Sequence, residues 1–292
     1  MKISKSRLTF NVFNYVLLGL IAFICVYPIW YVIIASMSDP QAVNTGCVWF
    51  LPKGFTLNAY AKVIKKTGIW VAYANSIFYM VVGTIVNLFV TICGAYPLSK
   101  KSLFGSKFLN IAITFTMWFS VGTIPVYLAF RDYGLLNTRS AIIFGFACST
   151  YNFILLRTYF SGLPEALEEA ARIDGASDIY ILRKIVLPLS LPAIATIGLF
   201  YAVSRWNGYL WAMILLSDDA KLPLQVVLKK LVVDMSGHAE NMSLGVEDMA
   251  KKISEETVMY ATIVVSIIPM LILYPCIQKH FVKGITLGAV KG

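Results

Sequence analysis

The sequence predicts an all-α, polytopic membrane bundle, and three observations lead to this fold class. Hydrophobic residues make up 58% of the 292 residues and charged residues 14%, whereas apolar residues supply about half of a soluble domain. The mean hydropathy is +0.73. The apolar residues also form continuous runs of the length that crosses a membrane as a helix, about 20 residues, and not the alternating segments of about ten residues typical of a β-barrel.

Six uncharged runs predict six transmembrane helices. They cover residues 8–38, 67–99, 108–130, 140–156, 185–204 and 257–278. Lys2, Lys5 and Arg7 precede the first run, which is too long for the core of a signal peptide and is expected to be an uncleaved anchor. This basic flank predicts a cytoplasmic N-terminus, and an even number of spans returns the tail, 279–292, to the same side.

The connections between the runs predict one transmembrane domain over 1–292. An outer loop is expected over 39–66, and a tight outer turn over 131–138, with Gly134 as its permissive residue. The longest outer loop, 218–256, holds an amphipathic helix candidate at 224–235 and a polar, glycine-containing tip at 236–245.

The cytoplasmic loop 161–188 is expected to form a compact knob of two short helices. Pro164 and the acidic residues after it are typical of a helix start. Asp174-Gly175 should end this helix, and Ser177 or Asp178 should cap a second one over 179–186. Pro188 is expected to turn the chain into the membrane.

Within this loop, the spacing of small, acidic and glycine residues resembles the coupling loop of the permease subunits of bacterial ABC importers. The residues that carry the resemblance are Glu169, Ala170, Ala171, Asp174, Gly175, Ile185, Leu187 and Pro188. In such permeases the knob sits in a cleft of a cytoplasmic ATPase. The small pair allows close approach to that partner, Gly175 makes the turn and Glu169 offers a charge. The alternative is that this loop is an ordinary amphipathic connector exposed to solvent, as many membrane proteins carry.

The resemblance extends over nearly the whole chain. The tail 278–292, the turn 133–138 and Trp206-Asn207 are similar to carbohydrate-importer permeases of the kind found as the second subunit of maltose transporters. The short N-terminus before the first span and residues 27–40, from Tyr27-Pro28 through Ser38-Asp39-Pro40, resemble the subgroup for polysaccharide or oligosaccharide uptake. The resemblance implies a type I importer architecture and the import of oligosaccharides across the bacterial cytoplasmic membrane by alternating access.

The resemblance also implies partners. These are a second permease in a heterodimer, a homodimeric cytoplasmic ATPase, an extracytoplasmic sugar-binding protein and the oligosaccharide itself. The chain has no G-x-x-x-x-G-K-[ST] segment that could hold ATP phosphates, so we expect no enzyme activity and no cofactor on this chain, with ATP and Mg on the ATPase. The net charge of +10 lies at the edges of the spans, which indicates lipid headgroups and not nucleic acid as the anionic partner.

Arg205 is a charge inside a predicted span, where charged side chains are costly and usually functional. With Trp206 and Asn207 it could line the substrate path, or it could make a structural polar contact. Asn87, Asn110 and Asn152 are expected to form hydrogen bonds between helices. By resemblance to the maltose system, Ser236, Gly237 and Gly245 in the outer loop could contact the binding protein.

Two other functions remain open from the sequence. An ABC permease of this kind could carry a polyamine, phosphate or an amino acid instead of a sugar. A secondary transporter would need no ATPase, but it should carry paired charges inside its spans and inverted halves, which the sequence does not show.

Overall fold

The computed structural model describes residues 5–119, 121–237, 255–272 and 274–275. Every regular element within these ranges is helical, which confirms the all-α fold class. The chain forms two compact units, Met1–Thr67 with Leu228–Ile268 and Gly68–Val227 with Pro269–Gly292. One domain over 1–292 stays a prediction.

The first unit is built around one long apolar helix. It contains α1 (Lys5–Ser36), α2 (Pro40–Asn44), α3 (Asn58–Lys65) and most of the helix Glu255–Ile272. The end of α1 packs in a small core, where Ile34 and Ala35 are buried and Tyr31 meets Tyr260 edge to face at 6.0 Å between ring centroids. Most of α1 exposes large apolar side chains on all sides, as expected for a helix that faces lipid or a partner subunit.

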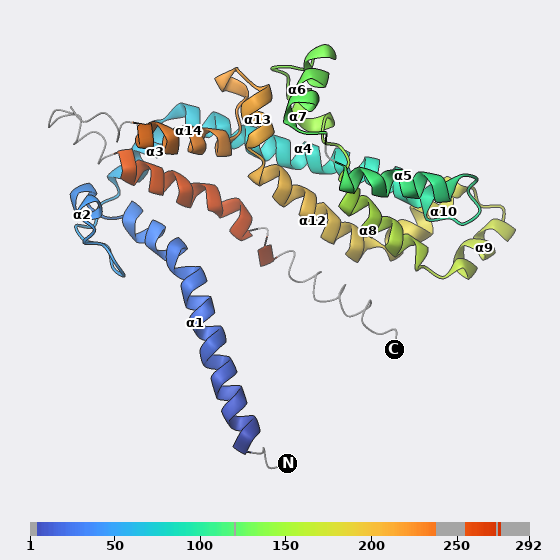
Figure 1. Cartoon of the computed structure of the whole chain (residues 1–292), viewed down its shortest axis with the longest axis horizontal. Helices are drawn as coiled ribbons and strands as arrows, with labels where there is room; N and C mark the ends of the chain where they lie inside the picture. Colours follow the sequence, from blue (N-terminus) through green and yellow to red (C-terminus); the bar gives the residue numbers. More distant parts are fainter. Residues whose placement is uncertain (1–4, 120, 238–254, 273, 276–292) are drawn as a thin grey trace. The chain divides into compact units, whose positions relative to one another are not determined.

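The second unit holds the remaining helices (Figure 1). They are α4 (Thr67–Leu98), α5 (Ser106–Trp118), α6 (Thr123–Asp132), α7 (Arg139–Phe144), α8 (Thr150–Ser161), α9 (Glu165–Ile173), α10 (Asp178–Ile181), α11 (Leu187–Leu189), α12 (Leu191–Asn207) and α13 (Leu210–Leu215), with α14 (Leu224–Gly237) running from this unit into the other. Helix α8 contacts α5 and α12, and α13 contacts α6 and α7.

Only some of the six predicted spans are single helices in the structure. Among the described residues, Phe10–Ser36, Thr67–Leu98 and Glu255–Ile272 are single helices long and apolar enough to cross a membrane. Two bent helix pairs also meet that test, and they correspond to the third and fifth predicted spans. The fourth span, predicted as one helix over 140–156, is instead the two short helices α7 and α8, with 145–149 between them.

The interruption between α7 and α8 lies between two hydrophobic cores of the second unit. One core joins α7 to α4, α6 and α13 through Tyr79, Phe130, Ile142 and Leu215. The other joins α8 to α4, α10 and α12, and its members include Ala95, Leu156, Ile181 and Tyr201. The two halves of the fourth apolar run are therefore buried in two separate cores. Because both halves are apolar, the hydropathy of the run predicts a single span.

Candidate functional site

Arg205 on α12 binds the end of α7. Its Nη2 donates to the backbone carbonyls of Ile143 at 2.9 Å and Phe146 at 2.8 Å, and its Nη1 donates to the carbonyl of Ile142. The last carbonyls of a helix have no partner within it and carry the negative end of its dipole. Arg205 supplies both hydrogen bonds and positive charge to these carbonyls, so it caps α7.

Asn87 on α4 holds the guanidinium from the other side. Its Oδ1 accepts from Arg205 Nη2 at 2.7 Å and from Nε at 3.2 Å, and its Nδ2 donates to the Phe146 carbonyl at 3.0 Å. The prediction that Asn87 forms hydrogen bonds between helices is confirmed. Gly83, one turn earlier, leaves room for Arg205, because a Cβ there would lie 2.9 Å from Arg205 Nε.

Tyr201, one turn before Arg205, holds the start of α8. Its hydroxyl accepts from the backbone N–H of Ser149 at 3.0 Å and lies 2.7 Å from Thr91 Oγ1. Ser149 is the N-cap of α8, and its own side chain makes no capping bond. Tyr201 was not singled out from the sequence, because a tyrosine in an apolar run carries no local signal of its partner.

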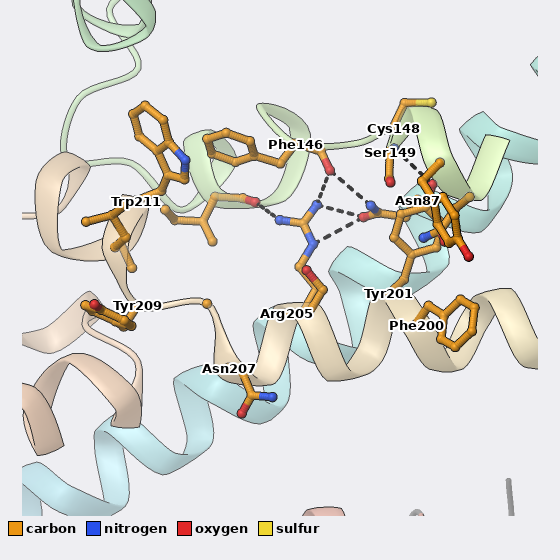
Figure 2. Close-up of a pocket in the computed structure, with 17 residues that line it drawn as sticks. Asn87, Phe146, Cys148, Ser149, Phe200, Tyr201, Arg205, Asn207, Tyr209 and Trp211 are labelled. Atoms are coloured by element: carbon orange, nitrogen blue, oxygen red, sulfur yellow. Dashed lines mark hydrogen bonds between the residues drawn. The ribbon is translucent and has the colours of Figure 1, made fainter. Parts of the chain in front are cut away.

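A cavity of about 650 Å³ lies against this interruption. Figure 2 shows Arg205, Asn87 and Tyr201 together, with Tyr209 and Trp211 also against the cavity. The lining residues are Asn87, Ile142, Phe146, Cys148, Ser149, Tyr151, Asn152, Phe200, Tyr201, Ser204, Arg205, Asn207, Gly208, Tyr209, Leu210, Trp211 and Ala212. Its size falls within the range of small-molecule sites, about 300–1,000 Å³.

The three candidate residues for the substrate path have different surroundings. Arg205 and Asn207 line the cavity. Trp206 does not line it; its side chain is 2% exposed and its ring lies edge to face with Tyr73, 5.8 Å between centroids. The geometry favours a structural contact for Arg205, and a sugar ring stacked on Trp206 in this cavity has no support. The role of the three residues in a substrate path stays a prediction.

The two-helix knob predicted for the 161–188 loop is present as α9 and α10. Helix α9 ends at Ile173, and two residues later Gly175 has a φ of +82°, the left-handed conformation that glycine adopts without strain. The N–H of Ala176 donates to the carbonyl of Ala171 at 2.9 Å, and that of Gly175 to the carbonyl of Arg172 at 3.0 Å. This pair of bonds is a Schellman motif. Asp174 is the C-cap residue between helix and turn.

The start of the second helix also follows the sequence prediction. Ser177 caps α10, with its hydroxyl accepting from the N–H of Tyr180 at 3.4 Å. Asp178 accepts from Arg172 at 2.8 Å and ties the two helices of the knob together. Ile181 is fully buried below them. The knob is therefore held by its turn, its cap and one ion pair.

The motif residues of α9 point to different surroundings. Glu169 and Ala170 are exposed, whereas Ala171 packs against the core below the knob. Glu168, beside them, is 9% exposed and forms an ion pair with Lys100, which also lies 4.7 Å from the centre of the Tyr96 ring. The Lys100 contact was not predicted, because 68 residues separate it from Glu168.

The chain continues past Pro188 before it bends, which corrects the prediction that Pro188 makes the turn. Ile185 lies in a π-helical turn, Leu182–Val186, and Leu187 and Pro188 continue the helix into α11. The bend of 82° comes between Leu189 and Leu191. Proline lacks an N–H and its ring crowds the carbonyl four residues earlier, so the wide turn directly before Pro188 has a local cause.

The predicted outer turn is present, and it is tied to a distant segment. Gly134 has a φ of +67°. The N–H of Asn137 donates to the Leu215 carbonyl at 2.8 Å, and its side-chain Oδ1 accepts from the N–H of Asp218 at 3.1 Å. A hydrogen bond from the backbone of Ala220, with Lys221 beside it, holds the pKa of the Asp218 carboxyl below its ordinary value.

The predicted binding-protein contacts fall at the edge of the described residues. The amphipathic helix predicted over 224–235 is α14, which runs through Ser236 to Gly237. Ser236 and Gly237 were expected in the tip of the loop and instead form the last turn of this helix. Gly245 and the tail 279–292 lie outside the described residues.

Comparison with known proteins gives a consistent family. Residues 66–287 match the family of the binding-protein-dependent transport system inner membrane component. The chain is 43% identical to the polygalacturonan/rhamnogalacturonan transport system permease protein YtcP of Bacillus subtilis (strain 168), over 99% of this chain and 100% of that protein. It is 39% identical to protein LplC of the same organism, over 99% and 97%.

A solved structure shares both the fold and the sequence. It is the crystal structure of a bacterial ABC transporter involved in the import of the acidic polysaccharide alginate, with 44% identity, a TM-score of 0.88 and coverage of 96% of this chain and 99% of that one. The interrupted helices α7 and α8 and the knob of α9 and α10 all lie within the residues that match this family. The chain belongs to the inner-membrane permease components of binding-protein-dependent ABC transport systems.

Proposed function

We propose that the chain is one of two permease subunits of an ATP-driven importer that moves oligosaccharides across the cell membrane by alternating access. The observation that carries the proposal is the family match over residues 66–287, joined to a relative named for polygalacturonan/rhamnogalacturonan transport and to the structure of an alginate importer. The N- and C-termini would be cytoplasmic. The cavity beside Arg205 would be part of the substrate path.

The cargo that the comparisons favour is an acidic oligosaccharide. Polygalacturonan and alginate, the polymers in two of the matched names, consist of uronic acids. A uronate carries a carboxylate at neutral pH, so its path needs hydrogen-bond donors and positive charge. A neutral sugar, a polyamine, phosphate or an amino acid would be the alternative cargo.

The knob of α9 and α10 is proposed to dock on a homodimeric ATPase, which binds ATP and Mg. Ile173 is 86% exposed and Ile179 is 68% exposed, and Glu169 has no ion-pair partner among the described residues. Such apolar side chains beside a free charge suit a cleft in another protein. Gly175, Ile185, Leu187 and Pro188 would keep the knob rigid, so that ATP-driven closure moves the spans.

The remaining partners complete the proposed assembly. A second, similar permease would form a heterodimer with this chain and cover part of the apolar surface that α1 exposes. An extracytoplasmic sugar-binding protein would deliver the cargo to the segment around Ser236, Gly237 and Gly245. Membrane lipids would cover the rest of the apolar surface.

Purification and uptake test this function. The chain should be expressed with its neighbouring genes, purified in mild detergent and reconstituted with the binding protein and internal ATP. We expect a second permease and an ATPase to co-purify, and trigalacturonate to be taken up in an ATP-dependent way. Uptake of a polyamine, phosphate or an amino acid, with no uptake of oligosaccharides, would contradict the proposal.

A further inference from the structure

The interruption between α7 and α8 leaves two helix ends of opposite polarity inside the second unit. The carbonyls at the end of α7 receive a full positive charge from Arg205. The start of α8 carries the positive end of a helix dipole, and it receives only the neutral hydroxyl of Tyr201, at the Ser149 N–H. Arg205 therefore supplies a cation at the end of α7, whereas among the described residues no anionic side chain bonds to the start of α8.

Hydrogen-bond donors remain unused at this end of α8. The N–H groups of Thr150, Tyr151 and Asn152 have no acceptor in the part of the chain that the structure describes. The first N–H groups of a helix have no intrahelical partner, and buried ones need another acceptor. Unpaired N–H groups together with the dipole favour binding of an anion.

Asn152 provides a second, independent observation at the same place. Its side chain is 5% exposed and lines the cavity, yet it has no hydrogen-bond partner among the described residues. No hydrogen bond from this side chain to a neighbouring helix is present among these residues, so that role of Asn152 stays a prediction. Its amide atoms are not among the fully buried atoms without a partner, so they are open to the cavity, where they can hydrogen-bond to the polar atoms of an occupant.

The cavity has the chemistry of a site for an acidic sugar. No aspartate or glutamate is among its described lining residues, and Arg205 keeps the local charge positive. Tyr209 and Trp211 add aromatic surface on which a sugar ring can pack. A phosphate group has the same need for donors, but it offers no ring for these aromatic side chains.

We propose that the start of α8 and the side chain of Asn152 bind the carboxylate of a uronate residue in the cargo. The carboxylate oxygens accept from the free N–H groups of α8 and from Asn152 Nδ2, and the sugar ring lies against the aromatic wall. The inference rests on the proposed function and names the group of the cargo that this chain recognises.

The test introduces a carboxylate of the protein's own at the site. The N152D variant places a negative charge in the first turn of α8, where acidic residues stabilise a helix, so the fold should survive. In the reconstituted transporter we expect N152D to raise the KM for trigalacturonate about tenfold or more, because tenfold in affinity corresponds to about 1.4 kcal/mol. N152L should give a smaller rise, since it removes the amide and adds no charge.

Two controls accompany these variants. N58D makes the same substitution in the first turn of α3, at an exposed residue that does not line the cavity, and it should keep the KM of the wild type. The neutral trimer obtained by reducing the carboxyl groups should show a KM changed less than twofold by N152D. If the wild type imports only the acidic trimer, the comparison of N152D with N58D decides.

Each other outcome contradicts the inference. An unchanged KM for trigalacturonate, or an equal loss for both trimers, excludes a carboxylate site at Asn152. A lower melting temperature and yield of the N152D complex, whatever the cargo, would assign the site to an acidic side chain of the partner permease. An effect that disappears in phosphatidylcholine vesicles free of anionic lipid would assign it to an anionic lipid headgroup. If the wild-type complex imports neither trimer, the proposed function itself fails.

Discussion

Tyr201 and Arg205 lie one turn apart on α12, and each binds one end of the interrupted segment. Tyr201 accepts from the N–H of Ser149, the N-cap of α8, and Arg205 donates to the last carbonyls of α7. In lipid, backbone groups must find partners within the protein. Tyr201 and Arg205 on α12 thus supply hydrogen-bond partners to the backbone at the centre of the fourth apolar run, where the run is not helical.

Replacing Tyr201 with phenylalanine removes the hydroxyl and keeps the ring, and it should lower the stability of the complex. In Y201F the Ser149 N–H loses its acceptor, and a buried donor left unpaired costs about 1–3 kcal/mol. We expect a lower melting temperature of the purified complex. Y209F is the control, because the Tyr209 hydroxyl has no described hydrogen bond and its ring still lines the cavity. Equal melting temperatures for the two variants would contradict the capping role.

Variants of Arg205 distinguish a structural role of this residue from a role in the substrate path. R205A removes the donors of several carbonyls and of Asn87 at once, so we expect a lower complex yield and melting temperature with every cargo. R205K should recover little, because an ammonium cannot reproduce the planar set of donors. Yield should be measured beside uptake of trigalacturonate and its neutral trimer. Full yield with a selective loss of acidic uptake would place Arg205 in the path.

The sequence predicted the elements whose causes are local. The knob follows from Gly175 and Ser177, a turn residue and a cap with their partners a few residues away. The interruption of 140–156 was missed because its stabilising partners, Asn87 and Arg205, lie more than 50 residues away along the chain. Gly145, followed by a serine and a threonine in the same apolar run, was the local signal that could have indicated a helix end and a new cap.

The contact of Lys100 with Glu168 should connect the knob to α4. The side chains are 22% and 11% exposed, and the pair lies at the base of α9. K100M leaves the Glu168 carboxylate without its cation, so we expect weaker stimulation of ATP hydrolysis by the loaded binding protein. The double variant K100E/E168K should recover part of the loss seen with K100E or E168K alone, with an interaction energy of about 0.5–3 kcal/mol for residues in contact.

The control for this pair is the exposed contact of Lys101 with Glu165. Their side chains are 92% and 75% exposed and their charged atoms are 3.8 Å apart. Exposed pairs contribute little, so K101M should leave the stimulation unchanged. Equal effects of K100M and K101M, or no recovery in the double variant, would show that the buried pair does not transmit the motion of the knob.

Changes at Gly175 and Glu169 should uncouple the permease from ATP hydrolysis. At a φ of +82° a proline cannot be accommodated, and G175P also removes the N–H that binds the Arg172 carbonyl. E169K reverses an exposed charge on the proposed docking surface. We expect both variants to insert into the membrane and to lose uptake. G162A is the control, since Gly162 is the C-cap of α8 and has a φ of −91° that alanine tolerates.

Normal uptake and normal ATP hydrolysis in G175P or E169K would exclude the knob as the coupling contact. A smaller test of the same turn is G175A. No atom lies within 4 Å of a Cβ placed there, so its cost is the left-handed backbone alone, about 1–2 kcal/mol. The loss of coupling should therefore increase from G175A to G175P.

The orientation of the chain is tested by labelling engineered cysteines. Cys25, Cys47, Cys93 and Cys148 are exposed in the described chain, so all five native cysteines must first be replaced. In that background, a cysteine at Gly237 should react with a membrane-impermeant thiol reagent added outside intact cells. A cysteine at Ser177, in the knob, should react only after the membrane is opened, because the ATPase is expected on the inner side. The opposite pattern would invert the membrane topology, and the knob could then no longer contact an ATPase.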